Sequence, residues 1–185
     1  MVADESEQVV LLDNSGQPIG AMRKDQVHST HTPLHLAFSC YLLNDRGEVL
    51  VTRRALGKRT WPGVWTNSFC GHPAPGEGFA EAIRRRGRDE LGADVTDIRV
   101  AIADLRYRAG GAGGGVENEI CPVYVARLER ELAPNPDEVS EWAWVLPATL
   151  ADAVEGAPFA FSPWLARQLP RLVALPGGAL VADVE

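Results

Sequence analysis

Two glutamates two positions apart, Glu117 and Glu119, place the tightest constraint on how this chain folds. In an extended strand alternate side chains share one face, so both carboxyl groups project on the same side. Cys121, Val123 and Val125 follow at the same spacing, which indicates that this face points inward. Buried carboxylates are very costly unless a positive charge or a shared proton compensates them. The sequence therefore predicts an interior site with a compensating group, of which a metal ion is the simplest.

Histidines supply candidate partners for these carboxylates. The chain has four histidines, and three of them fall within eight residues: His28, His31 and His35. The fourth, His72, follows Cys70 in a Cys-Gly-His motif. A lone histidine is more often an ordinary core or surface residue than a ligand, but this clustering favours a metal site. Neutral imidazoles suit zinc, manganese or iron, and carboxylates extend the choice to harder ions. His31 sits in a Ser-Thr-His-Thr-Pro loop and is interpreted as a bystander.

The three cysteines have different contexts. Cys40 and Cys121 are interpreted as small buried hydrophobic residues, which is the common role of a free cysteine. Cys70 stands two positions before a candidate ligand, so it is a candidate metal ligand, nucleophile or proton donor and acceptor, and spacing does not choose among these. The odd count and sparse spacing do not form a disulfide framework. This cysteine usage predicts a reducing, cytoplasmic location.

Composition narrows the class of protein. A length of 185 residues with 45% apolar residues predicts one globular domain. The net charge of −7 argues against a general nucleic-acid binder. The chain lacks a long apolar run, which argues against a membrane span, and its acidic N-terminus does not follow the order of a signal peptide.

Alternation and turn signals predict a chain dominated by strands, with helices between and after them. Strands are expected over residues 7–12, 35–43, 48–54, 64–69, 95–107, 116–127 and 141–145. A four-residue repeat predicts a helix over Glu77–Leu91, ended by Gly92 in the left-handed conformation. A last helix is expected to begin near Ser162-Pro163 and to carry a stripe of leucines at 165, 169 and 172. The glycine-rich stretch Gly110–Gly115 is the one biased segment.

Basic residues cluster in two places, at Arg53–Arg59 and at Arg84–Arg88. Such runs of basic residues usually lie on solvent-exposed faces of a protein. In an acidic protein with a candidate metal site they are also what binding of a diphosphate would require, because arginine offers a planar fork to phosphate oxygens and lysine a mobile charge.

The predicted helix carries a recognisable motif. Gly71-x5-Glu77-x7-Arg85, continued by Asp89-Glu90-Leu91-Gly92, resembles the Nudix box, Gly-x5-Glu-x7-Arg-Glu-hydrophobic-x-Glu-Glu-x-Gly. That family cleaves nucleoside diphosphates linked to other groups, using glutamates of this helix to hold magnesium. Here Arg86 replaces the first acid, Gly87 the hydrophobic residue and Asp89 the middle glutamate. Only Glu90 is unchanged, so the resemblance disfavours hydrolysis and makes Arg86 a candidate phosphate-binding residue.

Several further motifs agree with one branch of that superfamily. They are His28…Leu34-His35-Leu36-Ala37-Phe38, Thr52-Arg53-Arg54-Ala55, Trp61-Pro62-Gly63-Val64-Trp65-Thr66-Asn67, Cys70-Gly71-His72-Pro73, Tyr107-Arg108, Glu117-Asn118-Glu119 and Phe161-Ser162-Pro163-Trp164. In order and spacing these motifs, which span about residues 8–168, closely resemble the type I isopentenyl-diphosphate isomerases.

The resemblance implies a fold and an activity. The implied fold is an α/β (α+β) domain, a Nudix-type α/β/α sandwich with a mixed sheet. Residues 33–168 would form the Nudix domain, residues 1–32 an N-terminal strand and metal-ligand segment packed on it, and residues 169–185 a C-terminal tail. The implied activity is interconversion of isopentenyl diphosphate and dimethylallyl diphosphate, by a protein that is a monomer or a weak homo-oligomer.

The resemblance also implies roles for individual residues. One divalent metal (manganese, zinc or magnesium) would be surrounded by His28, His35, His72, Glu117 and Glu119. Glu90 would hold a magnesium ion that meets the substrate diphosphate, and the phosphates would be neutralised by Lys24, Arg54, Lys58 and Arg86. Cys70 and Glu119 would face opposite sides of the double bond, with Tyr107 near Glu119 and Trp164 over the isoprenoid carbons.

Two alternatives belong to other classes. A Nudix hydrolase of a nucleoside diphosphate derivative would require the glutamates that the helix lacks. A non-enzymatic metal-binding or phosphate-binding module would need neither Cys70 nor its pairing with Glu119.

Overall fold

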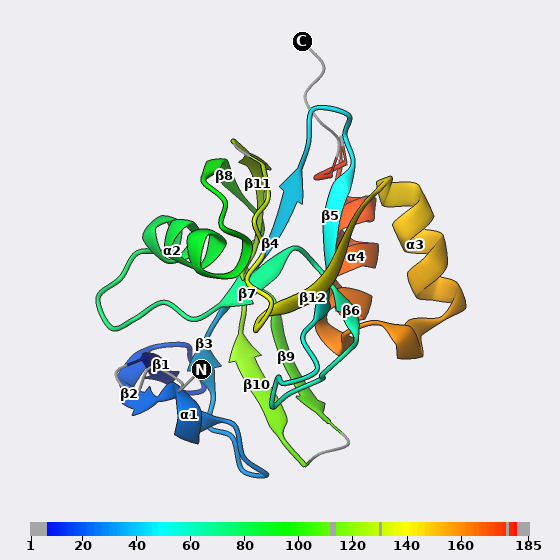
Figure 1. Ribbon diagram of the computed structural model, residues 1–185. Helices are drawn as coiled ribbons and strands as arrows, with labels where there is room; N and C mark the ends of the chain where they lie inside the picture. The colour runs from blue at the N-terminus through cyan, green and yellow to red at the C-terminus, as the bar shows by residue number, and fades with distance from the viewer. Residues whose placement is uncertain (1–6, 112–113, 130, 177, 181–185) are drawn as a thin grey trace.

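Two mixed β-sheets form the centre of the computed structural model, which describes residues 7–111, 114–129, 131–176 and 178–180. The strands are β1 (Gln8–Leu12), β2 (Pro18–Arg23), β3 (His35–Leu36), β4 (Phe38–Leu43), β5 (Val49–Arg54), β6 (Trp65–Thr66), β7 (Phe69–Gly71), β8 (Val95–Ile102), β9 (Arg106–Gly110), β10 (Val116–Ile120), β11 (Val123–Leu128) and β12 (Val139–Val145). The helices are α1 (Lys24–Val27), α2 (Phe79–Leu91), α3 (Pro147–Gly156), η1 (Pro158–Ala160) and α4 (Pro163–Ala174). Figure 1 shows α2 on one side of the strands and α3 with α4 on the other, which confirms the expected α/β/α layering.

Strand β4 lies at the centre of this sandwich, and all six of its residues are buried. Leu42 belongs to the core cluster that contains Ile83 of α2, whereas Tyr41 and Leu43 belong to the cluster that contains Leu165 of α4. Helices therefore cover both faces of the strand. A strand buried on both faces reads as a continuous apolar run rather than as an alternation, which is what β4 shows.

Two segments of the chain, β3–β4 and β10–β11, pass side by side from one sheet into the other and so join the two sheets. The smaller sheet has the order β2-β1-β3-β10-β9, and the larger has β12-β5-β4-β11-β8, with β6 paired to β5 and β7 to β4. β3 runs parallel to β10 in the first sheet, and their continuations β4 and β11 run parallel in the second. Backbone hydrogen bonds from Ala37 N to Ile120 O and from Ser39 N to Pro122 O bridge the crossing. The two sheets thus share a continuous parallel seam.

This crossing corrects the strand boundaries expected from the sequence. The strands expected over 35–43, 95–107 and 116–127 are each two strands, β3/β4, β8/β9 and β10/β11, that belong to different sheets. Side-chain alternation continues through such a crossing, so periodicity does not reveal it. Pro122 marks one of the breaks because proline has no N–H to donate to a ladder.

The helices also differ in part from expectation. α2 begins at Phe79 instead of Glu77, because the Glu77 carboxylate turns back to accept hydrogen bonds from Ala74 N and Arg85. Strand β2 and helices α1 and α3 were not anticipated. In α3 only Leu150 and Val154 are buried, so its apolar stripe is too narrow to predict a helix.

The last helix agrees with its prediction. α4 begins at Pro163, and the Ser162 hydroxyl caps it by accepting a hydrogen bond from Leu165 N. The leucines at 165, 169 and 172 are buried in the core. Every helix in the described part of the chain falls short of the length and apolar character that a bilayer-spanning helix needs. The stretch Gly110–Gly115 and the tail 169–185 lie partly outside the described residues.

We predict that Gly87 is required for the packing of α2. A Cβ at this position would lie 2.7 Å from Val95 Cγ2 and 3.3 Å from the Ala93 carbonyl oxygen. Gly87→Ala should lower the free energy of unfolding by about 1–3 kcal/mol, since overpacking exceeds the gain in helix propensity. Gly156→Ala, whose Cβ would meet nothing within 4 Å, is the matched control and should be neutral or stabilising. Urea denaturation compares the two; equal stabilisation of both variants would contradict the prediction.

Candidate active site

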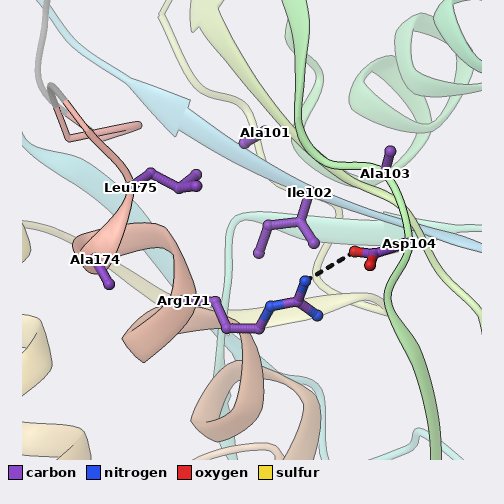
Figure 2. Close-up of a pocket in the computed structure, with 7 residues that line it drawn as sticks. All are labelled: Ala101, Ile102, Ala103, Asp104, Arg171, Ala174 and Leu175. Atoms are coloured by element: carbon purple, nitrogen blue, oxygen red, sulfur yellow. Dashed lines mark hydrogen bonds and ion pairs between the residues drawn. The ribbon is translucent and has the colours of Figure 1, made fainter.

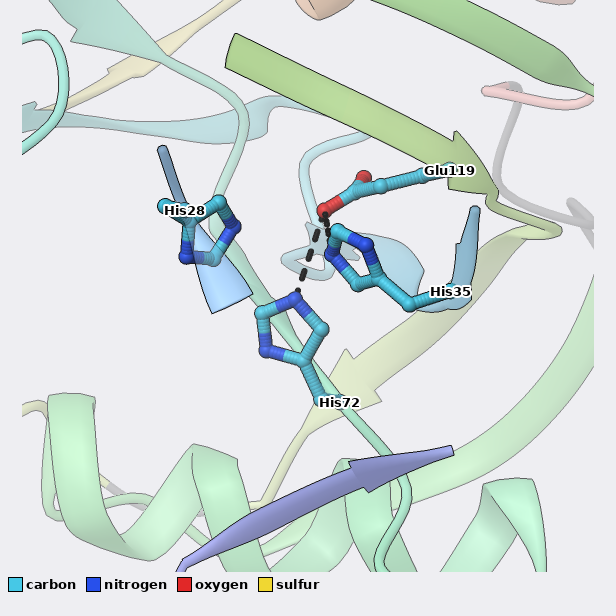
Figure 3. A group of neighbouring side chains, drawn as sticks. All are labelled: His28, His35, His72 and Glu119. Carbon is cyan, nitrogen blue, oxygen red and sulfur yellow. Dashed lines mark hydrogen bonds and ion pairs between the residues drawn. The ribbon is translucent and has the colours of Figure 1, made fainter. Parts of the chain in front are cut away.

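Three histidines meet beside the seam between the sheets. His28 directly follows α1, His35 lies in β3, and His72 directly follows β7. Their ring centroids are 5.2–5.7 Å apart in each pair. With Glu119 of β10 they offer ligand atoms that all lie within 4.8 Å of one another (Figure 3). Four of the five residues predicted to surround one metal therefore form a compact group.

Glu119 lies at the centre of this group. Its Oε1 atom is 3.3 Å from Nε2 of both His35 and His72, and its Oε2 atom accepts a hydrogen bond of 2.6 Å from the Tyr107 hydroxyl. Strand register explains these neighbours, because Glu119 is paired with His35 on one side and with Tyr107 on the other. Burial raises the pKa of Glu119, but the two histidines outweigh it and hold the pKa well below its ordinary value. The carboxylate is therefore ionised.

Glu117 completes the predicted set from the same face of β10. Its Oε2 atom lies 2.8 Å from His28 Nε2, without the alignment of a hydrogen bond. Both atoms are buried and have no hydrogen-bond partner, and the same holds for His35 Nε2 and His72 Nδ1. Burial lowers the pKa of His72 to about 4, so its ring is neutral, as a metal ligand must be. Unpartnered nitrogens and carboxylate oxygens that converge in this way fit a divalent cation.

Cys70 approaches the site from β7. Its sulfur lies 3.3 Å from the Ser39 hydroxyl and 3.3 Å from the side-chain oxygen of Asn67. Burial raises the pKa of the Cys70 thiol to about 12, and the Glu119 charge adds to the rise. All three cysteines are free, and Cys40 and Cys121 are buried, in agreement with their predicted core role.

Trp164, at the start of α4, forms an aromatic wall with Trp61. The two indole rings pack edge to face at 5.4 Å, and Trp61 adopts a φ of 44°, which is unusual for a residue with a side chain. Arg54 donates hydrogen bonds to the carbonyl oxygens of Thr60 and Trp61 and lies 5.4 Å from the Trp164 ring centroid. Arg54, which was predicted to bind phosphate, thus supports this wall in the structure. Sequence reasoning did not predict that Trp61 packs against Trp164, although Trp61 begins the quoted motif Trp61-Pro62-Gly63.

The remaining predicted phosphate-binding residues form a partly buried charge cluster beside α2. Arg86 of α2 is paired with Glu90 on its own helix and lies 3.7 Å from Glu138. Lys58 is also paired with Glu138, which precedes β12. These charges hold the pKa of Arg86 above its ordinary value despite its burial. Sequence reasoning missed Glu138, which follows Asp137 in a turn with no motif around it.

Lys24 joins the same cluster from the N-terminal side. Its ammonium group lies 2.9 Å from Glu7, and both are partly buried. Burial and the nearby positive charge of Arg86 lower the pKa of Lys24, whereas the charges of Lys24 and Arg86 lower that of Glu7. Lys24, Lys58 and Arg86 are thus close enough to act on one anionic group. In this structure their charges are balanced by Glu7, Glu138 and Glu90.

Comparisons with known proteins agree with this geometry. The NUDIX domain family model matches residues 33–171. The isopentenyl-diphosphate Delta-isomerase of Paenarthrobacter aurescens (strain TC1) is 61% identical over 97% of this chain and 98% of its own length. The enzyme of the same name from Leifsonia xyli subsp. xyli (strain CTCB07) is 58% identical over 92% of this chain and 94% of its own length. The chain belongs to the isopentenyl-diphosphate Delta-isomerase family of Nudix proteins.

Solved structures support the Nudix fold of this family member at much lower sequence identity. Protein DR0079 from Deinococcus radiodurans superposes with a TM-score of 0.68 at 21% identity, over 89% of this chain and 98% of that protein. A MutT NUDIX hydrolase from Burkholderia pseudomallei gives a TM-score of 0.58 at 20% identity, over 75% and 98%. These likenesses concern the fold alone.

The Nudix box of this isomerase-family chain differs from the hydrolytic pattern in its structure as well as in its sequence. Arg86, in place of the first acid, is buried and occupies the space beside Glu90. Gly71, which opens the box, packs so closely that a Cβ would lie 2.7 Å from Arg86 Cγ and 2.8 Å from the Phe38 ring. Gly71 therefore lets Cys70 and His72 approach α2 and β4.

A second concave region lies away from these residues. A depression of about 390 Å³ between β8 and the end of α4 is lined by Ala101, Ile102, Ala103, Asp104, Arg171, Ala174 and Leu175 (Figure 2). Its one ion pair joins Arg171 and Asp104 at 2.8 Å. None of the predicted site residues lines it, and it contains neither a histidine nor a cysteine. This depression is therefore separate from the histidine and carboxylate cluster.

We predict that the His/Glu cluster binds one divalent ion per chain. The double variant His72→Ala, Glu117→Gln removes two ligands and should lose the ion, along with the rise in melting temperature that a bound metal produces. His31→Ala is the matched control, because His31 is exposed and bonds to Thr30 outside the cluster. Metal content by mass spectrometry and thermal melts with added manganese or zinc measure both effects. Full occupancy in the double variant would contradict the assignment.

Proposed function

We propose that this protein interconverts isopentenyl diphosphate and dimethylallyl diphosphate, with Cys70 and Glu119 as the proton-transferring pair. The observation that carries the proposal is that the half-buried Cys70 thiol of β7 and the buried, tyrosine-bonded Glu119 carboxylate of β10 lie close enough for the Glu119 charge to act on the thiol. The family membership supports the same activity, because relatives at 54–61% identity over most of the chain are isopentenyl-diphosphate Delta-isomerases.

The reaction requires an acid and a base on opposite faces of an alkene. Addition of a proton to C4 of isopentenyl diphosphate leaves a tertiary carbocation at C3, and loss of a proton from C2 then forms the double bond of dimethylallyl diphosphate. Atoms balance, since one proton is gained and one is lost. A positioned acid or base contributes about 10²–10⁴-fold to such a step. Cys70 and Glu119 supply the two groups, and Tyr107 orients Glu119 through its hydrogen bond.

The carbocation has no heteroatom to share its charge, so its surroundings must stabilise it. The indole face of Trp164 is suited to this role, because a cation over an indole is stabilised by about 2 kcal/mol or more in a dry site. Trp164 is 3% exposed, and Trp61 packs against its edge. Burial also excludes water, which would otherwise capture the cation.

Charged groups would act at two ends of the site, a metal ion at the His/Glu cluster and basic side chains at the diphosphate. A divalent ion bound by His28, His35, His72, Glu117 and Glu119 (manganese, zinc or magnesium) would neutralise the carboxylates and fix the orientation of Glu119. Lys24, Lys58 and Arg86 would bind the diphosphate, with Arg54 supporting from the aromatic wall and Glu90 holding the magnesium that accompanies the substrate. The diphosphate would take over the cations that Glu7, Glu90 and Glu138 now neutralise.

The wider setting follows from the same features. The small isoprenoid diphosphate is the proposed partner, without nucleic acid or membrane. Free cysteines and the net charge of −7 support a cytoplasmic protein. We infer a monomer or a weak homo-oligomer, with residues 33–168 as the catalytic domain.

We predict isomerisation without loss of phosphate. In deuterated water the isoprenoid pool should gain deuterium at C2 and C4, while the diphosphate remains intact. Arg86 and Asp89 stand where a hydrolytic helix has glutamates, so water should not be activated against the diphosphate. Mass spectrometry and phosphorus NMR follow label and diphosphate in one sample. Release of phosphate or pyrophosphate without label would assign the protein to the Nudix hydrolases instead.

We also predict that Cys70 alone among the cysteines is essential. Cys70→Ala should bind isopentenyl diphosphate yet lose about 10²–10⁴-fold in kcat, the usual contribution of one acid or base. Cys40→Ala and Cys121→Ala are the matched controls, because both residues are buried and should affect stability more than turnover. Steady-state kinetics and substrate titration separate the two effects. Equal activity of the three variants would make Cys70 a structural residue.

A further inference from the structure

Asn67 joins the Cys70 thiol to the Trp164 indole. Its side-chain oxygen accepts a hydrogen bond of 2.9 Å from Trp164 Nε1 and lies 3.3 Å from the Cys70 sulfur, which donates to it. Asn67 is fully buried. One oxygen atom therefore sets the position of the thiol relative to the aromatic wall.

The orientation of the Asn67 amide follows from its partners. Its Nδ2 atom donates to the carbonyl oxygens of Cys40, at 3.0 Å, and Phe69, at 2.7 Å. A reversed amide would set an oxygen against two carbonyl oxygens and an NH₂ group against the indole N–H. Each of these contacts would leave buried groups unpaired, at about 1–3 kcal/mol per group. The acceptor oxygen is thus held toward Cys70 and Trp164.

Ser39 holds the thiol from the other side. Register places Ser39 of β4 directly opposite Cys70 of β7, and the hydroxyl oxygen is 3.3 Å from the sulfur. Gln168 of α4 donates to that oxygen at 2.8 Å and accepts a hydrogen bond of 2.9 Å from the Tyr41 hydroxyl. The Ser39 oxygen also lies 3.4 Å from the Cys121 sulfur, so the hydroxyl is held between two thiols and the Gln168 amide.

We propose that Asn67 and Ser39 act as a thiol clamp, a pair of positioning residues that fix Cys70 for proton transfer to or from substrate carbon. This inference rests on the proposed function. Asn67 supplies an acceptor for the thiol proton, the Ser39 hydroxyl makes a second hydrogen bond with the sulfur, and Asn67 also locks the indole of Trp164 at a constant place beside them. A displacement of about 1 Å in such a group can cost about 10²-fold in rate. The clamp is therefore a determinant of kcat.

Ser68 offers a control for a merely structural role. It is adjacent to Asn67, equally buried, and also bridges backbone groups, since its hydroxyl accepts from Leu42 N and donates to Leu50 O, both at 2.7 Å. Its hydroxyl has no hydrogen bond to Cys70 or Trp164. Ser68→Ala thus removes comparable buried hydrogen bonds and leaves the clamp intact.

The test compares Asn67→Ala, Ser39→Ala and Ser68→Ala in the full chain. It measures melting temperature, kcat and KM for isopentenyl diphosphate, and the NMR resonance of the Trp164 indole N–H, assigned with Trp164→Phe. Asn67→Ala should lower kcat about 10²-fold, with KM within about threefold, and should shift the indole resonance. Ser39→Ala should lower kcat in the same way and leave the indole resonance in place. Ser68→Ala should lower only the melting temperature.

The outcomes separate this inference from the proposed function. Unchanged kcat in either folded clamp variant would overturn the clamp, as would a loss of kcat in Ser68→Ala equal to that in Asn67→Ala. If Asn67→Ala does not fold, Ser39→Ala decides in the same way. Absence of isomerisation by the wild-type protein would instead refute the proposed function, and the indole resonance would still report whether Asn67 holds Trp164.

Discussion

Glu119 carries a carboxylate that is only 5% exposed, and the cost of removing such a group from water must be offset locally. His35, His72 and Tyr107 provide that compensation through contacts of 2.6–3.3 Å. Among the described residues, His72 Nδ1, His28 Nε2 and Glu117 Oε2 are buried without a hydrogen-bond partner. The site is therefore suited to hold a further positive charge, and the strands that form it place all of these groups within a few ångströms.

The seam between the sheets meets this requirement. β3 and β10 run parallel up to the crossing, which sets Glu119 beside His35, and β9 lies on the other side of β10, which sets Tyr107 against the same carboxylate. Beyond the crossing, β4 pairs with β7 and brings Ser39 against Cys70. The proposed acid–base pair, Cys70 and Glu119, thus comes from the two sheets, one member from each. A one-residue slip of register would turn either group to the opposite face of its sheet.

The helix α2 carries a different charge pattern from the Nudix box that it resembles. Arg86 places a buried cation beside Glu90, and Lys24 and Lys58 come close to it from distant segments. Glu7 and Glu138 balance these cations in the structure. In the proposed function this cluster would bind the diphosphate, and the reacting carbons would then lie between the thiol, the carboxylate and Trp164.

The amino-acid sequence by itself determined the chemistry of the site and the local elements. The repeat in α2, the leucine stripe of α4 and the inward face of Glu117 and Glu119 depend on neighbours a few residues apart, and local periodicity records them. Tertiary structure decided which strands belong to which sheet, the contacts of Arg54, and the positions of Glu138 and Asn67. These depend on pairs of residues far apart in the chain, for example Lys58 with Glu138 and Ser39 with Gln168. Only the packed chain brings such groups together, because each contact follows from strand register and helix packing and not from the residues adjacent to it.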